Sequence, residues 1–453
     1  MSKIVGIVVC SLIFLSDAFG VLAQSDDATA PVYSPVVDSD EQAIPVNVPN
    51  SAETTDLEAR ISALENSLAK QKEKQDSANK ITIKSIGRVY MDGYLFADQK
   101  NVQEQENYFS FRNVWFGVRG EGYKIFDYSL ELAFEPTTNG AELKNVFVGV
   151  KNVPFLDYVR AGYYKVETGM AYLQSPNHST AMELAHPSSV FAFNRRLGVS
   201  STHYLADDRL RWFAGVFGEE AGTIGTAKSY VNDSQGTILN TRLTMLPLTS
   251  ADGKRFFHTG AHYTYVDRAA SASAAAFRLK PGGIPNSANI VNSGFSGVTR
   301  FSEGGVEFAY QNHRWALQSE LYGMNYSGTG GGNIYGGYVE ARCFLADCYR
   351  SYEKKSGVIG NIKMEESQNL YFEENDGMYS PKSWGVAEAF VQWAFVNASD
   401  LVPETRVQDI TAGITWYWNP NTRTIFEYIH SMPEDRGTKG SIDALGMTLR
   451  YFF

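Results

Sequence analysis

The amino-acid sequence predicts an all-β protein: a transmembrane antiparallel β-barrel of sixteen strands, preceded by a short coiled-coil helix. From about Lys84 to Phe453 the chain is a series of roughly ten-residue segments with alternating apolar and polar side chains, the length of a tilted membrane strand. The 40 Gly, 26 Tyr and 27 Phe exceed what an ordinary polar enzyme surface carries. Apart from the N-terminus, no apolar run approaches the ~18 residues of a spanning helix.

The C-terminal segment shows the alternation most clearly. Small, polar or charged residues fall between its apolar positions, which are Leu445, Met447, Leu449, Tyr451 and Phe453. Because side chains alternate across a strand, one face is apolar up to the last residue. A soluble sheet would bury that face in a core, whereas a membrane barrel would turn it to lipid. The terminal aromatic is similar to the signal that outer-membrane assembly machinery reads.

The N-terminal part divides into three expected segments. Residues 1–23, with the apolar run IVGIVVCSLIFL, are expected to be a signal peptide. Residues 24–53 lack periodicity and are typical of a disordered leader. Residues 54–80 carry a heptad seam at Leu57, Ile61, Leu64 and Leu68. The seam predicts a short periplasmic coiled coil if the body behind it is a trimer, and otherwise a solvated spacer helix.

Residues 84–453 are predicted to form the barrel. We count sixteen segments, and an even count places both chain ends on the periplasmic side. A further strand pair could lie in residues 269–302 or 347–382, which would give eighteen. Charged residues in the middle of a strand are costly against lipid but not against water, so we expect them to face a wet lumen. Sixteen strands leave an aqueous channel rather than a packed interior.

The segment between the fifth and sixth strands is the expected constriction. Residues 165–196 span roughly 30 residues, too many for a hairpin turn, so we expect them to fold into the lumen and narrow it. A short helix is expected at Ser179 to Ala185. The candidate lining residues are Lys165, Glu167, His178, Glu183, His186, Arg195 and Arg196.

Several segments in order resemble the phosphate-selective porin O and P family: RVYMDGYLF, FRNVWFGVRGE, AMELAHPSSVFAFNRRLGV, WGVAEAFVQWAF and ITAGITWYWNPNTRTIFEY. The resemblance spans about residues 84–453. It implies a homotrimer in the outer membrane, with anions passing along inward arginines and with lysines near the constriction. By position, the family's arginine sites fit Arg88, Arg112, Arg196 and Arg242.

Alternation within the strands provides an independent test of these arginines. It aims four of them inward: Arg88, Arg160, Arg211 and Arg242. It conflicts with the resemblance at Arg112, which alternates with the apolar Val114 and Phe116, and a bulge or strand end could decide that conflict.

Four positions depart from the family pattern. Asn113 and Gln392 stand where the family often has Arg, Leu184 where Arg is common, and Ala171 where Glu is frequent. The series of inward basic residues that the resemblance implies is therefore incomplete, which puts phosphate selectivity in question.

Composition and the remaining residues narrow the function. The formal net charge of −10 gives no sign of nucleic-acid binding. We expect a disulfide between Cys343 and Cys348 because the chain is exported, with two unpaired thiols as the alternative. The seven His residues are scattered outside any G-x-S-x-G or H-E-x-x-H motif, so no enzyme, metal site or cofactor is expected.

The leading hypothesis is an outer-membrane porin for passive diffusion of small solutes, expected to be anions such as phosphate. The alternatives are a general or organic-solute porin without phosphate selectivity, an outer-membrane enzyme, and a secreted β-rich binding protein. Charge selectivity separates the first two, and a hydrolase assay or fractionation without detergent tests the others.

Overall fold

The computed structural model describes residues 60, 62–67, 80–134, 141–219, 236–268, 275–375 and 378–453. Residues 1–70 and 71–453 form separate compact units. In the first unit, Arg60 and residues 62–67 are helical. The signal peptide, the leader and the rest of the coiled-coil segment lie outside the described residues, so those three remain predictions. Among the helices of the described part, none has the length and apolarity to cross a membrane.

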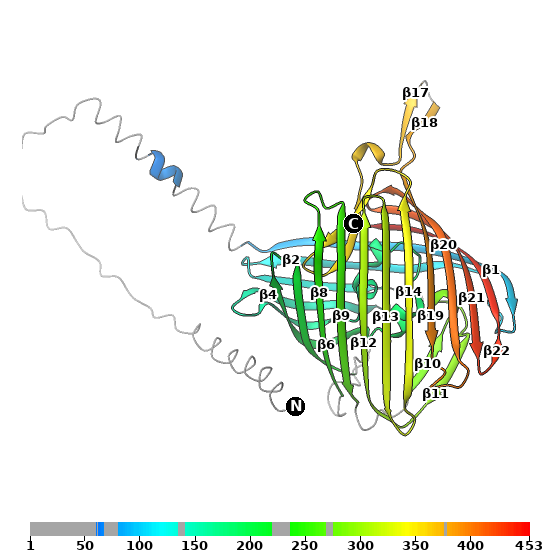
Figure 1. The fold of residues 1–453 in the computed structure, drawn as a ribbon. Helices are drawn as coiled ribbons and strands as arrows, with labels where there is room; N and C mark the ends of the chain where they lie inside the picture. The colour runs from blue at the N-terminus through cyan, green and yellow to red at the C-terminus, as the bar shows by residue number, and fades with distance from the viewer. Residues whose placement is uncertain are drawn as a thin grey trace, which may run out of the picture. The chain divides into compact units, whose positions relative to one another are not determined.

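One antiparallel sheet closes into a barrel (Figure 1). Within the described residues seventeen strands belong to it, and all but the two-residue β22 (Thr438–Lys439) go around the wall, which leaves the sixteen predicted strands. The wall strands are β1 (Thr82–Lys100), β2 (Tyr108–Gly122), β3 (Phe126–Ala133), β4 (Glu142–Val153), β5 (Asp157–Lys165), β6 (Arg195–Leu205), β7 (Leu210–Gly218), β8 (Thr237–Thr249), β9 (Arg255–Asp267), β12 (Val298–Asn312), β13 (Trp315–Gly328), β14 (Gly332–Phe344), β19 (Val386–Asn397), β20 (Arg406–Asn419), β21 (Thr422–Asp435) and β23 (Ser441–Phe452).

The first and last strands close the barrel. β1 pairs with β23 from Arg88 opposite Phe452 to Lys100 opposite Ser441. Beyond this ladder, the backbone N–H of Gly87 donates to the Phe453 carbonyl at 3.0 Å, and the N–H of Phe453 donates to the Gly87 carbonyl at 3.0 Å. The last residue of the chain is therefore part of the seam.

Three further hairpins pair only internally, so the alternative count of eighteen wall strands is wrong. They are β10 (Ala275–Leu279) with β11 (Val291–Phe295), β15 (Tyr349–Glu353) with β16 (Val358–Lys363), and β17 (Tyr371–Asn375) with β18 (Met378–Ser383). The first lies within the expected stretch 269–302, and the other two lie mostly within 347–382. β17 and β18 project from the barrel (Figure 1).

The two ends of the barrel differ in their connections. We call the end where β1 begins and β23 ends the turn end, because most of its connections are short, as at residues 206–209. This turn bends through left-handed backbone at Asp207 and Asp208, a conformation that Asp tolerates well. The opposite end is the loop end. The exception at the turn end is the long connection 345–385 between β14 and β19.

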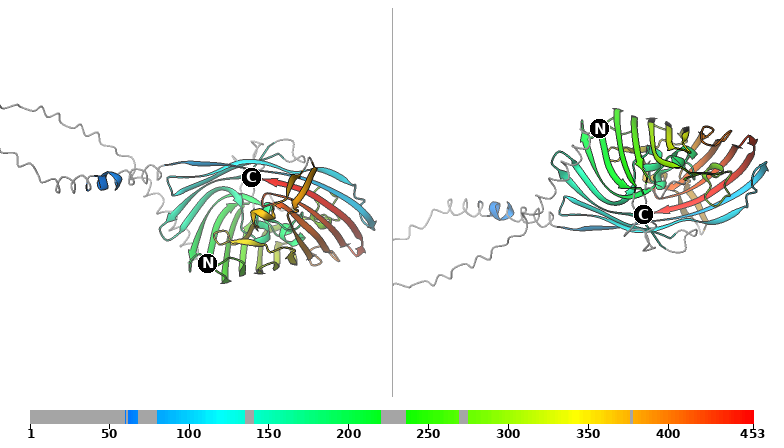
Figure 2. Two further views of the ribbon diagram at one scale, coloured as in Figure 1. Left: turned by 90° about the horizontal axis from the view of Figure 1, so that it is seen from above. Right: turned by 90° about the horizontal axis from the view of Figure 1, so that it is seen from below.

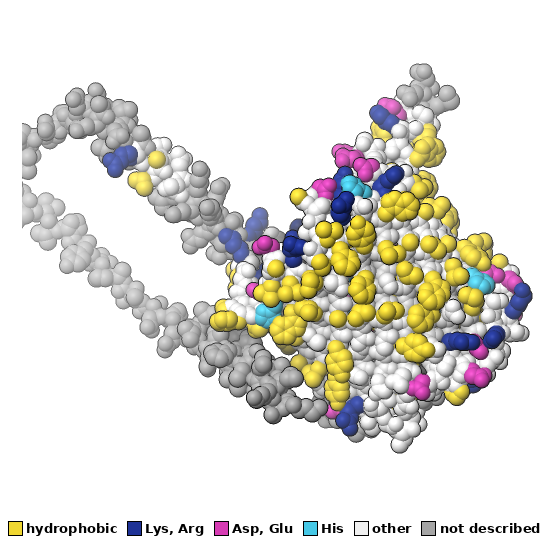
Figure 3. All heavy atoms as spheres, viewed as in Figure 1, with side chains coloured by type: hydrophobic (Ala, Val, Ile, Leu, Met, Phe, Trp, Pro, Cys, Tyr) yellow, Lys and Arg dark blue, Asp and Glu magenta, His cyan; other side chains and the backbone are white. Residues whose placement is uncertain are grey.

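The outer and inner faces of the wall follow the predicted alternation. In the C-terminal segment, Leu445 of β23 and the following Phe453 are 52% and 51% exposed, whereas Thr448 and Arg450 are buried on the inner face. Figure 3 shows hydrophobic side chains spread over the outward strand faces, with most charged side chains toward the barrel ends. An apolar outer face with charges turned inward is what lipid outside and water inside require.

Three segments fold inward from the wall and occupy the lumen (Figure 2). The inner loop, residues 166–194, carries α3 (Met170–Leu173), η1 (Pro176–His178) and α4 (His186–Val190). The inner hairpin, β15 with β16, enters from the turn end and is followed by η3 (Glu366–Gln368). The third segment belongs to the connection between β9 and β12. It contains η2 (Pro281–Gly283), which contacts β21 and α4.

The helix expected at Ser179 to Ala185 is wrong, since these residues are non-helical and α4 begins at His186. Wall side chains bind the backbone groups that a helix would use. The Thr415 hydroxyl donates to the Thr180 carbonyl at 2.8 Å, and the Met182 N–H donates to Glu427 at 2.9 Å.

Candidate functional site: the narrowed lumen

Two cavities in the lumen meet at one lysine. The constriction cavity, about 140 Å³, is enclosed by the inner loop and by wall residues from β1 and β2 to β14 and β19. The vestibule cavity, about 800 Å³, lies along the β1–β7 side and reaches the turn end at Thr82 and Lys355. Lys165, at the end of β5, lines both cavities. Among the lining residues it is the one common to both cavities.

The vestibule is lined by more cations than carboxylates. Seven basic residues line it: Lys84, Arg119, Lys151, Arg160, Lys165, Arg211 and Lys355. Its three carboxylates are Glu121, Asp127 and Glu167. Clustered charge of one sign along a cleft attracts the opposite ion into it.

Aromatic rings hold Arg160 in the vestibule wall. Its guanidinium lies 4.3 Å from the Phe147 ring centroid and 5.1 Å from both the Tyr158 and Tyr164 centroids. Its Nε donates to the Tyr158 hydroxyl at 2.9 Å. Among the described residues, no carboxylate lies within 4.0 Å of it. Ring contacts position a cation without neutralising it, so the Arg160 charge remains available to an anion.

A second basic group surrounds Trp115 on β2. The guanidinium of Arg88 lies 3.4 Å from its ring centroid, that of Arg195 lies 5.2 Å away, and the ammonium of Lys144 lies 5.5 Å away. Side-chain amides orient both arginines: Arg88 donates to Asn113 at 3.1 Å and Arg195 to Asn145 at 2.9 Å. The sequence predicted Arg88 and Arg195 as lumen residues, but no local pattern indicated that the Trp115 ring lies between them.

Lys165 is fixed by the inner loop. Its ammonium donates to the Tyr172 carbonyl and lies 4.5 Å from the Tyr172 ring centroid. Among the described residues no carboxylate pairs with it, unlike Lys151, which binds Glu121 at 2.7 Å. The predicted constriction lysine therefore lies where the two cavities meet and has no carboxylate partner among the described residues.

The opposite side of the lumen carries carboxylates that hold the inner loop. Glu320 on β13 accepts the backbone N–H groups of Met170 and Ala171, the latter at 3.1 Å. Glu427 on β21 accepts the N–H of Met182 at 2.9 Å. Backbone N–H groups of the inner loop therefore find their acceptors on side chains of the wall, which fixes the loop to the wall.

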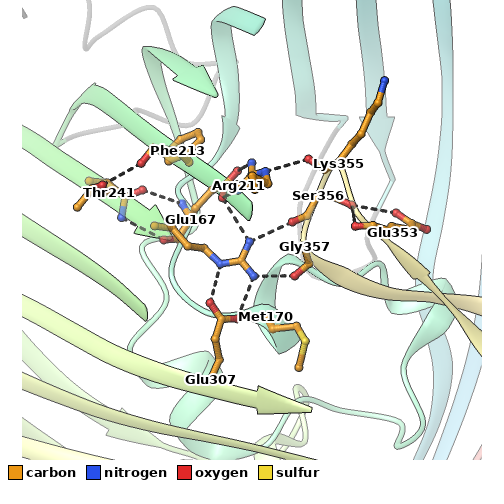
Figure 4. A network of polar contacts seen from close by, with 12 residues as sticks. Glu167, Met170, Arg211, Phe213, Thr241, Glu307, Glu353, Lys355, Ser356 and Gly357 are labelled. Carbon is orange, nitrogen blue, oxygen red and sulfur yellow. Dashed lines mark hydrogen bonds and ion pairs between the residues drawn. The ribbon is translucent and has the colours of Figure 1, made fainter. Parts of the chain in front are cut away.

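Two arginines predicted to line the pore, Arg211 and Arg242, are tied to carboxylates, and Figure 4 shows Arg211 with Glu167. Arg211 binds Glu167 with two bonds of 2.7 and 2.6 Å and also donates to the Lys355 carbonyl. Arg242 is fully buried, binds Glu307 at 2.7 and 2.9 Å, and donates to Gly357 of the connection between β15 and β16. Both arginines face inward as predicted. The inner hairpin, which sequence reasoning did not foresee, covers Arg242 and removes it from the water-filled lumen.

Burial and nearby arginines set the pKa values of two titratable groups in the inner loop. Burial raises the pKa of the Glu167 carboxyl, but Arg211 and Arg242 lower it more, so this carboxyl is held ionised. Burial, together with Arg423 and Arg350, lowers the pKa of His178 to about 3. His178 is therefore neutral at physiological pH and adds no charge to the lumen.

A β-bulge settles the conflict at Arg112. The register between β1 and β2 shifts after Tyr90 opposite Asn113, so that Met91 lies opposite Phe111 and Arg112 is the extra residue. Arg112 turns inward and binds Glu183 of the inner loop at 2.9 and 3.2 Å. The arginine position implied by the resemblance is therefore inward, and Glu183 accompanies it.

Arg196 also faces inward, since its neighbours Leu197 and Val199 are exposed on the outer face. Its guanidinium donates to the Arg195 carbonyl at 2.9 Å. It is half-buried and is not among the residues that line the two cavities.

The disulfide expected between Cys343 and Cys348 is absent, because both are free thiols. Cys343 alternates with the inward Arg342 and Phe344 and so lies on the outer face of β14, whereas Cys348 is buried beside Phe344 inside the barrel. The wall separates the two sulfur atoms.

The four positions that depart from the family pattern meet in one place. Asn113, Ala171, Leu184 and Gln392 all line the constriction cavity, although they come from β2, the inner loop and β19. Sequence reasoning identified each separately and missed that they converge. It also missed Arg342 and Arg450, which line the same cavity from β14 and β23.

Comparison with known proteins places these features in context. The profile of a family described as phosphate-selective porin O and P matches residues 84–453. None of the curated proteins matches the chain.

Several solved structures are similar to this chain. OprB of Pseudomonas putida has a TM-score of 0.51 at 8% identity, covering 84% of this chain and 96% of that one. An anion-selective porin from Comamonas acidovorans has a TM-score of 0.47 at 12% identity, covering 83% of this chain and 100% of that one. The trimer form of OmpT of Vibrio cholerae has a TM-score of 0.47 at 11% identity, with the same coverages of 83% and 100%.

Proposed function

Because the chain belongs to the phosphate-selective porin O and P family, we propose that it passes small anions along the β1–β7 side of its lumen. The protein is a porin of the bacterial outer membrane, through which small solutes diffuse down their gradients. By strand parity the turn end is periplasmic and the loop end faces the outside.

One observation carries the proposal. Among the described residues, five cations on this side have no carboxylate within 4.0 Å, and four of them line a cavity. The five are Lys84, Arg160, Lys165, Arg195 and Lys355. They extend from the turn end to the constriction, where an anion would exchange one cation for the next. A path of several weak sites supports both entry and release.

Three further features belong to the proposal. The apolar outer face contacts outer-membrane lipid. Three copies assemble, as in the trimer form of OmpT to which the fold is similar, and the trimer would also stabilise a coiled coil formed by residues 54–80. Passage is diffusion, with no bond made or broken and no cofactor, so the protein is not an enzyme. A general or organic-solute porin is the alternative, favoured by the amide side chains of Asn113 and Gln392 in the constriction cavity.

The test is the zero-current potential of the purified protein in a planar bilayer under a potassium chloride gradient. We expect an anion preference that falls in Lys165→Met and Arg160→Met and persists in Lys382→Met, a matched change on the projecting hairpin. A cation preference of the unmodified protein would overturn the proposal.

A further inference from the structure

The constriction cavity is rich in neutral hydrogen-bonding groups. Four carboxamide side chains line it: Asn113, Gln174, Gln318 and Gln392. The inner loop adds the hydroxyls of Ser175, Ser179 and Thr180. Of its four lining cations, Arg112 and Arg342 are bound to Glu183 at 2.9 Å and to Glu340 at 3.1 Å, whereas Arg450 donates to the Ser179 hydroxyl at 2.9 Å and Lys165 to the Tyr172 carbonyl.

The carboxamides keep hydrogen-bonding capacity for a solute. Gln174 donates its amide to the His178 carbonyl at 2.6 Å, and Gln392 donates to Glu340 at 3.0 Å. Within the described part of the chain, the side-chain oxygens of both glutamines accept no hydrogen bond. Asn113 is reversed: its oxygen accepts from Arg88, and its amide N–H groups remain available. The cavity therefore presents acceptors and donors together.

This arrangement suits hydroxyl groups better than a bare oxyanion. A hydroxyl both donates and accepts, so it satisfies a glutamine oxygen and an asparagine amide alike. Inorganic phosphate offers mainly acceptor oxygens, which would face the oxygens of Gln174 and Gln392 and the carboxylates of Glu183 and Glu340. Polar groups left unpaired at a narrow point are costly, so the cavity disfavours such a solute.

Size and charge complete the argument. A cavity of about 150 Å³ accommodates one six-membered ring, and the constriction cavity is about 140 Å³. Two lining cations have no carboxylate within 4.0 Å among the described residues: Lys165 at the junction with the vestibule, and Arg450 of β23. Arg450 is held by the inner loop, because it donates to the Pro176 carbonyl at 3.2 Å and to the Ser179 hydroxyl at 2.9 Å. One anionic group can therefore be held at Lys165 while the rest of the solute contacts the carboxamides.

We propose that the constriction selects small organic anions that carry several hydroxyl groups, such as sugar acids, over inorganic phosphate. This inference rests on the proposed anion pathway and specifies its solute. The anionic group pairs with Lys165, and the hydroxyls exchange water for Asn113, Gln174 and Gln392 as the solute moves through.

The test measures how solutes interrupt the chloride current of single channels. Gluconate is expected to reduce the current at a concentration at least about tenfold lower than inorganic phosphate or acetate, since one or two hydrogen bonds correspond to about one such factor. Acetate has the charge without the hydroxyls, and glucose has the hydroxyls without the charge, so glucose should also block poorly. Equal block by gluconate and acetate, or stronger block by phosphate, would overturn the inference while anion selectivity stands. A cation-selective channel would instead overturn the pathway itself.

Two variants locate the effect. Gln392→Met and Gln174→Met keep side-chain length but remove the acceptor, and each should raise the half-blocking concentration of gluconate about five- to tenfold while leaving that of acetate unchanged. Gln408→Met, an exposed change on β20, is the matched control and should change neither. If the constriction variants leave gluconate block unchanged, the carboxamides are not the selecting groups.

Discussion

The two sides of the lumen wall use inward charges in opposite ways. On the pathway wall, β1–β7, cations such as Arg160 and Lys165 face cavities and have no carboxylate partner among the described residues. On the anchor wall, the wall strands from β8 to β23, carboxylates such as Glu307 and Glu320 are fully buried against the inner loop, the inner hairpin or arginines. The same strand alternation turns both sets inward, so burial by the inserted segments separates a conducting surface from a structural one.

The energetics of burial explain the anchor wall. A buried charge is stable only when it is paired or fully hydrogen-bonded. Arg350 of the inner hairpin meets Glu388, and Arg450 meets inner-loop carbonyls, among them that of Pro176 at 3.2 Å. On the pathway wall, cations such as Arg160 need no such pairing, because the vestibule of about 800 Å³ leaves room for water to solvate them. A net charge of −10 for the whole chain therefore coexists with a basic pathway.

The largest loss of stability is expected at the buried ion pair between Arg350 and Glu388 on the anchor wall. We expect Glu388→Gln to lower the free energy of unfolding by about 3–5 kcal/mol, because it leaves a buried guanidinium without its carboxylate. Urea titration in lipid vesicles measures the change. Glu373→Gln, which removes an exposed pair with Lys382, should cost under about 1 kcal/mol. Equal costs would mean that the anchor wall is no more structural than the surface.

How much of these walls the sequence predicts depends on how far apart along the chain the contacting residues lie. Sixteen strands and their inward faces were predictable because lipid and water impose a two-residue period within each strand. The inward turn of Arg112 was not, because one bulge residue reverses that period. The inner hairpin was not predictable either. Its partners Arg242 and Glu388 lie on separate strands, and no local pattern joins them.

A smaller effect is expected at His186, which ties the inner loop to the anchor wall. Burial lowers the pKa of His186, but the Asp409 carboxylate raises it more, so it lies above the ordinary value. The charged form therefore stabilises the fold fully below about pH 6.5, and this contribution is lost as the pH rises through the raised pKa.

The urea midpoint should fall between pH 6 and pH 9, by less than the loss in Glu388→Gln, and His186→Gln should reduce that fall. His203→Gln, at a half-buried histidine of β6, should retain it. An unchanged fall in His186→Gln would show that the Asp409 pair does not set the pH dependence.

The charge of the conducting side can be changed at Glu183, whose carboxylate offsets the positive charge of Arg112 in the constriction cavity. Glu183→Gln should raise the chloride-over-potassium permeability ratio roughly twofold, a modest factor because lumen water screens the charge. Glu374→Gln on the projecting hairpin is the control. A lower ratio in Glu183→Gln would place Arg112 outside the ion path.

The smallest effect is expected at the cysteines. Burial raises the pKa of the Cys348 thiol to about 11, so a maleimide should leave it unmodified in the folded protein and label it after unfolding. Mass spectrometry counts the labels. Cys343→Ser should leave conductance unchanged, because its side chain lies on the outer face. A mass loss of two hydrogens, with no label after unfolding, would show that the two cysteines form a disulfide.

The most direct test of the two-wall account is charged thiol modification during current recording, in a Cys343→Ser, Cys348→Ser background. Thr82→Cys places a thiol at an exposed position of the vestibule on the pathway wall, and Ser431→Cys places one in the buried anchor wall. The account predicts that an anionic methanethiosulfonate reduces the current of Thr82→Cys and leaves that of Ser431→Cys unchanged. Equal modification at both positions, or modification at Ser431→Cys alone, would contradict it.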